Sequence, residues 1–417
     1  MEQESCSLNS HLKKKSGKIA FYMENFIKQL TLEGYTSHTI NGYVGSISHF
    51  GWWLNNQGID LGEIKESTIV DFGEHECTCP GNRSQKKISK KYLKRVQKFF
   101  IYLQSQGIVS FSTFNIEDTI QAPLSDFRIW LDQNRGLAEA TINKYERLVH
   151  KLLPDLGKDP SLYNAKIIKK VIFNQALQYS LPQVKTIITA LRSYLKFLTT
   201  KGICQANIIN SVPTIPEWRL SSMPTYLDEN SVELIIKLCD KKTNHGVRDR
   251  AILLLLYRLA LRAGDIINMN IDDLDWINAT VRVKGKGRKE ILLPLPQDVG
   301  DAIIDYLKIR PKVSISKIFL CANAPYRAIA KSASISDIVR TALSRAGIDN
   351  ISTKGSNLLR HTAATIMLRN GATLETISAV LRHQSTDMSA YYAKVDIKML
   401  NKITQPWPGG EPCCEKM

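Results

Sequence analysis

Two stretches in the first half of the chain resemble each other, and this internal repeat limits the possible folds more than any other feature of the sequence. The first runs from Gly34 to Tyr43 and the second from Gly136 to Tyr145, and each ends in Thr-Ile-Asn, one further residue and tyrosine. An apolar segment precedes each stretch, near Phe26 in the first case and near Phe127 in the second. Internal similarity of this kind indicates one structural unit that occurs twice.

A second pair of similar segments follows the first pair. Apolar residues occur three or four positions apart from Tyr92 to Leu103, and the same relative spacing recurs from Ile187 to Leu198. Each series is followed by a glycine-isoleucine pair, which begins at Gly107 or Gly202. This spacing predicts an amphipathic helix, and the glycine provides a stop at its C-terminal end. We therefore predict two similar helical domains in tandem.

The remaining third of the chain is predicted to be a separate domain. Prolines at positions 213, 216 and 224 interrupt any helix and indicate a linker. Helices open and close the last domain, and between them apolar residues alternate with polar ones around a basic turn, which predicts a β-hairpin. The alternating residues are Val281, Val283, Ile291 and Leu293.

The expected fold is mainly α with a small β-sheet in the last domain. The predicted segments are a helical domain at 1–115, a second helical domain at 116–215, a linker at 216–224 and an α+β domain with a tail at 225–417.

The charge balance favours a polyanionic partner. The 56 lysines and arginines exceed the 39 acidic residues and give a net charge of +17, and basic surfaces bind nucleic acid by releasing its condensed counterions. The eight cysteines are scattered and the first fifteen residues lack an apolar stretch, so we expect a cytoplasmic protein. The apolar run from Ala251 to Leu261 is too short to cross a membrane and predicts a buried helix.

Three clusters in the last domain carry side chains suited to phosphate chemistry. The first contains Arg262 at the end of an apolar helix, with Asp265 three residues later. The second is the basic turn of the hairpin. The third begins at Asn357 and is followed by further histidines and tyrosines. The segments are Tyr257 to Ile267, Lys284 to Arg288, Asn357 to Thr362, Leu381-Arg382-His383 and Tyr391-Tyr392.

From Leu227 to Val395 these clusters resemble the catalytic domain of the tyrosine recombinase (phage integrase) family. The family's Gly-Leu-Arg motif corresponds to Ala260-Leu261-Arg262, and its Gly-Lys-Gly turn to Gly285-Lys286-Gly287. Its His-x-Leu-Arg-His motif corresponds to Asn357 to His361, and its Leu-Gly-His, with a tyrosine nine residues later, to Leu381-Arg382-His383 and Tyr392. Two residues depart from the pattern, because Asn357 replaces a histidine and Arg382 replaces a glycine.

The resemblance implies a set of catalytic residues with separate roles. It also implies that the two helical domains resemble the SAM-like core-binding domains with which such enzymes hold DNA. Asp265, Asn357 and His361 are supporting residues, and Asn357 contributes a neutral hydrogen bond at most. The implied catalytic residues are Arg262, Lys286, Arg360, His383 and Tyr392.

Elementary chemistry supports these roles. Two guanidinium groups clamp the oxygens of a phosphate and remain charged at neutral pH, which suits Arg262 and Arg360. A phenol with an ordinary pKa of about 10 needs a positive pocket and a proton acceptor before it attacks. His383 is expected to orient the phosphate or to handle this proton. Lys286 is the expected acid for the departing 5′ oxygen, with Lys284, Arg288 and Lys289 as weaker candidates.

The expected function is site-specific recombination of a mobile element, by integration, excision or transposition, through a 3′-phosphotyrosyl intermediate and without a cofactor. Each residue alone also has a structural explanation, and Tyr391 competes with Tyr392 as nucleophile, although its spacing from His383 is one residue short. A type IB topoisomerase and an inactive DNA-binding accessory protein are the alternatives. The order and spacing of all five residues favour the recombinase.

Double-stranded DNA is the expected partner, bound by a homotetramer on paired sites, with helper proteins left open. The segment from Arg83 to Lys98 contains no acidic residue. Its Tyr92, Val96 and Phe99 are predicted to pack inward while the basic face meets phosphates. The expected DNA contacts are Lys87, Lys91, Lys94 and Lys98 in this segment, together with Lys284, Arg288 and Lys289 in the hairpin.

The sequence His75-Glu76-Cys77-Thr78-Cys79 raises the question of a zinc site. A structural zinc ion usually has four well-spaced ligands, and no second spaced pair lies nearby in the sequence. The sequence alone therefore favours a loop without metal at this position.

Overall fold

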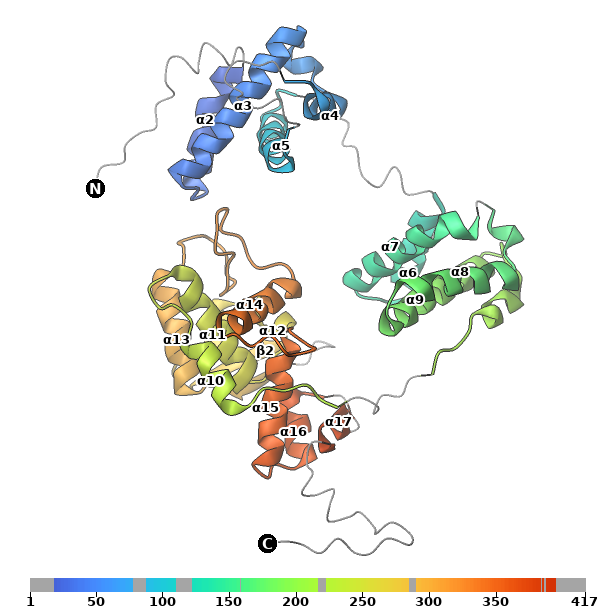
Figure 1. Ribbon diagram of the computed structural model, residues 1–417, viewed down its shortest axis with the longest axis vertical. Coiled ribbons are helices and arrows are strands. Elements are labelled where there is room, and N and C mark those ends of the chain that lie inside the picture. The colour runs from blue at the N-terminus through green and yellow to red at the C-terminus, as the bar shows by residue number, and fades with distance from the viewer. Residues whose placement is uncertain are drawn as a thin grey trace, which may run out of the picture. The chain divides into compact units, whose positions relative to one another are not determined.

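The computed structural model describes residues 19–77, 88–109, 122–157, 159–216, 223–284, 290–383, 385 and 388–394. Backbone contacts divide the chain into two compact units, of which one is 110–218 and the other is 1–109 together with 219–417. The fold is mainly α with one small antiparallel sheet, as predicted (Figure 1). The domain boundaries at 115 and 215 stay predictions. None of the described helices combines the length and the apolar character that crossing a membrane requires.

The first helical repeat, residues 19–109, is built around α3. This helix packs against both α2 and α5, and α4 packs against α5. Phe26, Phe50 and Phe99 are fully buried in the first helical repeat. Its described elements are α2 (Ile19–Leu32), α3 (Ser37–Gln57), the 3-10 helix η1 (Leu61–Glu63), α4 (Glu66–Glu74) and α5 (Lys90–Ser105).

The second helical repeat, residues 122–216, has the same order of helices. Here α7 packs against both α6 and α9, and α8 packs against α9. The similarity between the two stretches of sequence therefore extends to the helices that they form. The elements are α6 (Ala122–Arg135), α7 (Glu139–Leu156), η3 (Pro160–Leu162), α8 (Ala165–Gln178), α9 (Leu181–Thr200) and η4 (Ala206–Ser211).

Local signals in the sequence explain where the last helices of the two repeats begin and end. The hydroxyl of Ser89 accepts a hydrogen bond from the backbone N–H of Tyr92 and caps α5. Gly107 and Gly202 follow α5 and α9 with φ angles of 70° and 73°. This left-handed conformation is easy for glycine and costly for other residues, so the predicted helix stops are confirmed.

Residues 223–394, called the catalytic region after the domain that the resemblance implies, have α11 at their centre. The residues from Ala251 to Leu256 are all buried, and α11 packs against α13 and α15, which confirms the predicted buried helix. The helices are α10 (Glu229–Lys237), α11 (Asn244–Arg258), α12 (Ala263–Asn268), η5 (Ile271–Asp273), α13 (Gln297–Ile309), α14 (Ser332–Arg345), α15 (Asn357–Arg369), α16 (Leu374–Leu381) and α17 (Ala390–Ala393).

The sheet of the catalytic region contains the predicted hairpin and one further strand. It consists of β1 (Leu274–Asp275), β2 (Thr280–Lys284) and β3 (Glu290–Pro294), in the order β1-β2-β3. Val281 lies opposite Leu293 and Val283 lies opposite Ile291 in antiparallel register. The two valines are buried, and the alternation in the sequence reflects this one-sided burial. The basic turn at 285–289 lies outside the described residues.

Candidate active site

The side chains of Arg262 and Arg360 meet at the C-terminal end of α16. Nη2 of Arg262 donates to the carbonyl oxygens of Leu381 (3.4 Å) and Arg382 (3.2 Å). Arg360 donates from Nη2 to the same Leu381 carbonyl and from Nη1 to the carbonyl of Ala260. The last carbonyls of a helix lack partners within the helix and carry partial negative charge. This helix end therefore orients both arginines and joins the three motif segments.

Arg360 is buried beside other cations. Only 5% of its surface is exposed. Burial, followed by the charges of Arg262 and Arg382, lowers the pKa of Arg360 to about 10. The group therefore remains charged at neutral pH.

Arg382, which occupies the position of the family's glycine, forms a buried ion pair. Its φ of 52° and ψ of 50° are left-handed, a conformation that costs a residue other than glycine about 1–2 kcal/mol. Its Nη2 donates to Oδ2 of Asp265, which also accepts from the backbone N–H of Arg262 at 2.9 Å. The side chain is 4% exposed, and its Nε and Nη1 have no hydrogen-bond partner among the residues that the structure describes. The carboxylate of Asp265 thus links the side chain of Arg382 to the backbone at Arg262.

Tyr392 lies on α17 with 2% of its surface exposed. Its hydroxyl is 2.8 Å from Nδ1 of His361. Burial raises the pKa of Tyr392 to about 12, although the charges of Arg360 and Arg262 act in the opposite direction. The phenol is therefore protonated at neutral pH and needs a proton acceptor before it can act as a nucleophile.

The two histidines of the site differ in their contacts. Burial and Arg360 lower the pKa of His361, which contacts the tyrosine hydroxyl. His383 instead stacks on the ring of Tyr392, with centroids 6.5 Å apart and planes 6° apart, and its Nδ1 lies 2.9 Å from Oγ of Ser389. Burial, Arg360 and Arg262 lower the pKa of His383 to about 4. Both imidazoles are therefore neutral at pH 7, and His361 is the one positioned to accept the proton.

The neighbouring Tyr391 has a different environment. Its hydroxyl donates to the carbonyl of Met223 at 3.1 Å. Nζ of Lys394 lies 5.5 Å from the centre of its ring. These contacts fit a tyrosine that ties α17 to the segment preceding α10.

The supporting residue Asn357 and the basic residues of the hairpin differ in what the structure shows of them. Asn357 is exposed at the first residue of α15. Lys284 is exposed at the end of β2, with Nζ 3.6 Å from the carboxylate of Glu290. The remaining basic residues proposed for the hairpin turn, namely Lys286, Arg288 and Lys289, lie outside the described residues.

The lysines predicted to contact DNA from the first helical repeat also differ. Lys91 and Lys94 are exposed on α5. Lys98 is half-buried, with Nζ 2.6 Å from Oε2 of Glu33 and 2.9 Å from the hydroxyl of Tyr35. Lys87 lies outside the described residues. Val96 and Phe99 are buried as predicted, and Tyr92 is half-buried.

Comparison with known proteins finds integrases and recombinases as relatives of this chain. The profile of the phage integrase family matches residues 225–399. The protein named "Putative integrase/recombinase y4rA" of Sinorhizobium fredii is 32% identical over 400 residues, which is 94% of this chain and 95% of that protein.

Two solved structures show the same fold at low sequence identity. The XerH site-specific recombinase bound to palindromic difH substrate has a TM-score of 0.52 and 17% identity, over 74% of this chain and 93% of that one. A lambda integrase tetramer bound to a Holliday junction has a TM-score of 0.50 and 12% identity, over 74% of this chain and 88% of that one.

The fold and these relatives define the class of the protein, which is that of the tyrosine recombinases. The chain belongs to the phage integrase family. It is accordingly an enzyme of site-specific DNA recombination.

Sequence reasoning did not anticipate two features of the site. It expected His383 to orient the phosphate or to handle the tyrosine proton and named His361 only as a supporting residue, whereas the structure places His361 at the hydroxyl. It also noted Arg382 only as a departure, without its pairing to Asp265. The signal for the second feature was present, because a charged residue in the place of a glycine requires a partner when it is buried.

Proposed function

We propose that this recombinase cleaves and rejoins double-stranded DNA through a temporary covalent bond between Tyr392 and a 3′ phosphate. The observation that carries the proposal is the contact of 2.8 Å between the hydroxyl of Tyr392 and Nδ1 of His361. This contact supplies the proton acceptor that a buried phenol needs. Arg360 and Arg262 both act on the same phenol electrostatically, which supports a role for them beside the reacting group.

The excess of positive charge suits a phosphodiester. Arg262, Arg360 and Arg382 contribute three positive charges, and Asp265 balances one of them. Negative charge accumulates on the phosphate oxygens during phosphoryl transfer, and fixed guanidinium groups stabilise it without reorganising. Arg262 and Arg360 are proposed to bind the two non-bridging oxygens. Asp265 and Arg382 hold the backbone and the helix end that position them.

The reaction proposed for each strand is a balanced transfer. The hydroxyl proton of Tyr392 passes to Nδ1 of His361 while the phenolic oxygen forms a bond to phosphorus. The bond between phosphorus and the 5′ oxygen breaks, and Lys286 donates a proton to that oxygen. The assignment of Lys286 rests on its place in the hairpin motif. Rejoining reverses these steps, so the phosphotyrosyl bond conserves the energy of the linkage and no nucleotide cofactor is consumed.

The biological reaction is proposed to be the integration, excision or transposition of a mobile element. The relative named as an integrase/recombinase, which aligns with nearly the whole chain, supports this choice. The two helical repeats are proposed to hold DNA, which favours a recombinase over a topoisomerase. Assembly of four chains on two paired DNA sites is proposed by analogy with the lambda integrase tetramer bound to a Holliday junction.

The experiment begins with DNA that the chain itself selects. The Tyr392→Phe variant is used to recover tightly bound duplexes from a random library, because it is expected to bind without cutting. Nicked substrates made from the recovered sites are then incubated with wild type, Tyr392→Phe and Tyr391→Phe. We expect a covalent adduct that resists SDS with wild type and Tyr391→Phe, and none with Tyr392→Phe.

Other outcomes separate the alternatives. Absence of any adduct from wild type on DNA that it binds tightly contradicts the proposal and favours an accessory DNA-binding protein. Rapid relaxation of supercoiled plasmids that lack the selected site favours a topoisomerase.

A further inference from the structure

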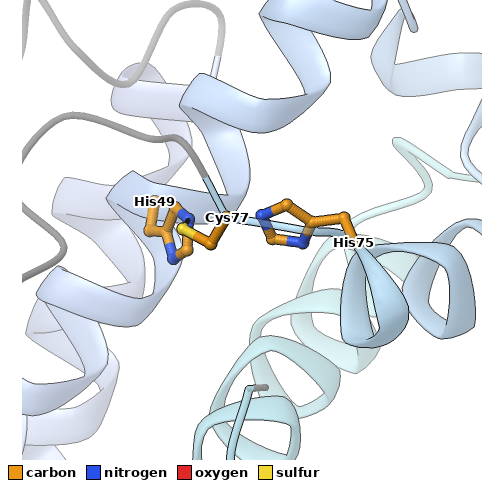
Figure 2. A group of neighbouring side chains, drawn as sticks. All are labelled: His49, His75 and Cys77. Carbon is orange, nitrogen blue, oxygen red and sulfur yellow. Dashed lines mark hydrogen bonds between the residues drawn. The ribbon is translucent and has the colours of Figure 1, made fainter. Parts of the chain in front are cut away.

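The first helical repeat contains a group of three side chains of the kinds that bind transition metals. His49 lies on α3, His75 caps the C-terminal end of α4, and Cys77 follows two residues later. One ligand atom from each residue lies within 4.8 Å of the others, and all three residues are half-buried. Figure 2 shows Cys77 between the two imidazole rings. No catalytic motif includes these residues.

Hydrogen bonds determine which nitrogen of each ring can bind a metal. Nδ1 of His75 lies 2.6 Å from the carbonyl oxygen of Phe72. A carbonyl oxygen can only accept, so Nδ1 carries the proton and the lone pair is on Nε2. Metal-binding histidines typically donate their other ring N–H to an acceptor of this type.

The same reasoning applies to His49. Nδ1 of His49 lies 3.0 Å from the hydroxyl of Tyr92, which also lies 3.2 Å from the carbonyl oxygen of Gly45. When this hydroxyl donates to Gly45 it accepts from Nδ1, and the lone pair of His49 is then on Nε2, which lies 3.3 Å from Sγ of Cys77. In these tautomers Nε2 is the atom through which each histidine would bind a metal.

The distance between these donors fits zinc. Tetrahedral zinc has bonds of about 2.0–2.1 Å to histidine nitrogen and about 2.3 Å to cysteine sulfur, which places adjacent N and S ligands ~3.6 Å apart. The separation of 3.3 Å between Nε2 of His49 and Sγ of Cys77 is close to this value. Imidazole and thiolate are also the ligands that zinc most often has in proteins.

The rings are held by aromatic neighbours. His75 stacks on Phe72 with centroids 5.0 Å apart, and His49 meets the same ring edge-on at 5.2 Å. Packing of this kind explains why the imidazoles are buried. It does not account for the thiol of Cys77, which adds a third potential metal ligand 3.3 Å from Nε2 of His49.

The second helical repeat provides an internal comparison. Gly34 and Gly136 are 102 positions apart, and the same offset pairs His49 with Lys151. Lys151 donates to the hydroxyl of Tyr179, which follows α8 as His75 follows α4. In the second repeat, a lysine-tyrosine contact therefore joins α7 to the C-terminal end of α8. At the equivalent place the first repeat has two imidazoles and a thiol.

We propose that His49, His75 and Cys77 bind a zinc ion that fastens the chain after α4 to helix α3. The connection from α4 to α5 spans 75–89, whereas only Tyr179 and Ser180 connect α8 to α9. A longer connection loses more conformational entropy on folding, and a metal crosslink offsets that loss. The sequence favoured a loop without metal because only the structure brings His49 to the cysteine. Cys79 lies outside the described residues and is not part of the proposed site.

The first test measures zinc in the full-length chain, purified without a histidine tag and without chelators. We expect about one zinc ion per chain. His49→Asn and Cys77→Ser should lower the zinc content at least fivefold. His38→Asn and Cys321→Ser, which change a histidine and a cysteine elsewhere, should retain the wild-type content. Wild type that takes up no zinc after reconstitution overturns the proposal.

A second test replaces zinc by cobalt and measures the absorption of the bound metal. It reports the ligands directly and includes the wild type, so it does not depend on the folding of one variant. Cobalt bound by a thiolate gives a ligand-to-metal charge-transfer band, which we expect in wild type. Cys77→Asp offers a carboxylate in place of the thiolate and should bind cobalt with a weaker band. An unchanged band in Cys77→Asp, or unchanged zinc in His49→Asn with native helical content by circular dichroism, overturns the proposal.

Discussion

The active site and the His49–His75–Cys77 cluster both combine side chains from separate segments, but the chemical groups that they bring together differ. The active site holds the guanidinium groups of Arg262, Arg360 and Arg382, and burial, followed by the charges of Arg262 and Arg382, lowers the pKa of Arg360 to about 10. The cluster contains two imidazoles and a sulfur ligand, and no guanidinium or ammonium group is among its three members. Grouped cations are suited to an anion such as a phosphate, and neutral nitrogen and sulfur donors are suited to a metal cation.

The two groups also differ in what positions them. Arg262 and Arg360 are oriented by the carbonyls at the end of α16. The imidazole of His49 contacts the hydroxyl of Tyr92, and that of His75 contacts the carbonyl of Phe72. In both cases hydrogen bonds to backbone carbonyls or to a hydroxyl orient the functional side chains. Each site is therefore arranged before a ligand binds. The following changes test the cationic side of this comparison, in order of decreasing expected effect.

Removing a guanidinium group should have the largest effect. We expect Arg262→Ala to slow adduct formation on a nicked substrate by about 10²- to 10³-fold or more, because it removes a fixed stabiliser of the transition-state charge. Arg262→Lys should be intermediate, since lysine keeps the charge but loses the bidentate geometry. Single-turnover rates measure the effect, and thermal unfolding checks that the variants remain folded. A folded Arg262→Ala within tenfold of wild type contradicts the assigned role.

Removing the proton acceptor should have the next largest effect. His361→Gln is expected to slow adduct formation by about 10²-fold, the lower range for a general base. His383→Gln serves as the matched control, because it changes the histidine that stacks on Tyr392 without contacting its hydroxyl. A larger loss in His383→Gln than in His361→Gln shows that the proton goes to the other imidazole.

The pH dependence of the rate of adduct formation tests the role of His361 independently. Reaction requires neutral His361, and burial and Arg360 hold its pKa below the ordinary value of 6.5. The wild-type rate should therefore stay constant as pH falls through neutrality, and decline only at lower pH as His361 becomes protonated. In His361→Gln this decline should be weaker. A wild-type rate that already falls between pH 8 and pH 7 is inconsistent with this assignment.

The smallest effect concerns exposed lysines of the first helical repeat. Lys91→Gln and Lys94→Gln should each reduce the slope of log K against log salt by about 0.9 if the side chain contacts one phosphate. Lys98→Gln is the control from the same helix, because Lys98 is already paired with Glu33. Binding titrations at several salt concentrations provide the slopes. Equal changes in all three variants indicate a general charge effect and not specific contacts.

Features encoded by local spacing could be predicted from the sequence. The helix stops at Gly107 and Gly202 depend on short segments, and both are present in the structure. The hairpin follows from alternation, and Val281 and Val283 lie buried on one face. The order of the motifs around Arg262, Arg360 and Tyr392 placed the chain in its family.

Contacts between distant segments could not be predicted in the same way. His361 and Tyr392 are 31 positions apart, and whether their atoms meet depends on how α17 packs against α15. His49 approaches Cys77 only because α3 and the end of α4 pack together. The pairing of Arg382 with Asp265 likewise spans 117 positions. The sequence indicates that a buried Arg382 requires a partner, but tertiary packing decides which residue that partner is.

The central claim is most directly tested by locating the bond between protein and DNA. The adduct formed by wild type on a nicked substrate is digested with protease and nuclease, and the peptide that carries the residual nucleotide is sequenced by tandem mass spectrometry. We expect the nucleotide mass on Tyr392 and not on the adjacent Tyr391. Attachment to Tyr391 or to any other residue contradicts the account.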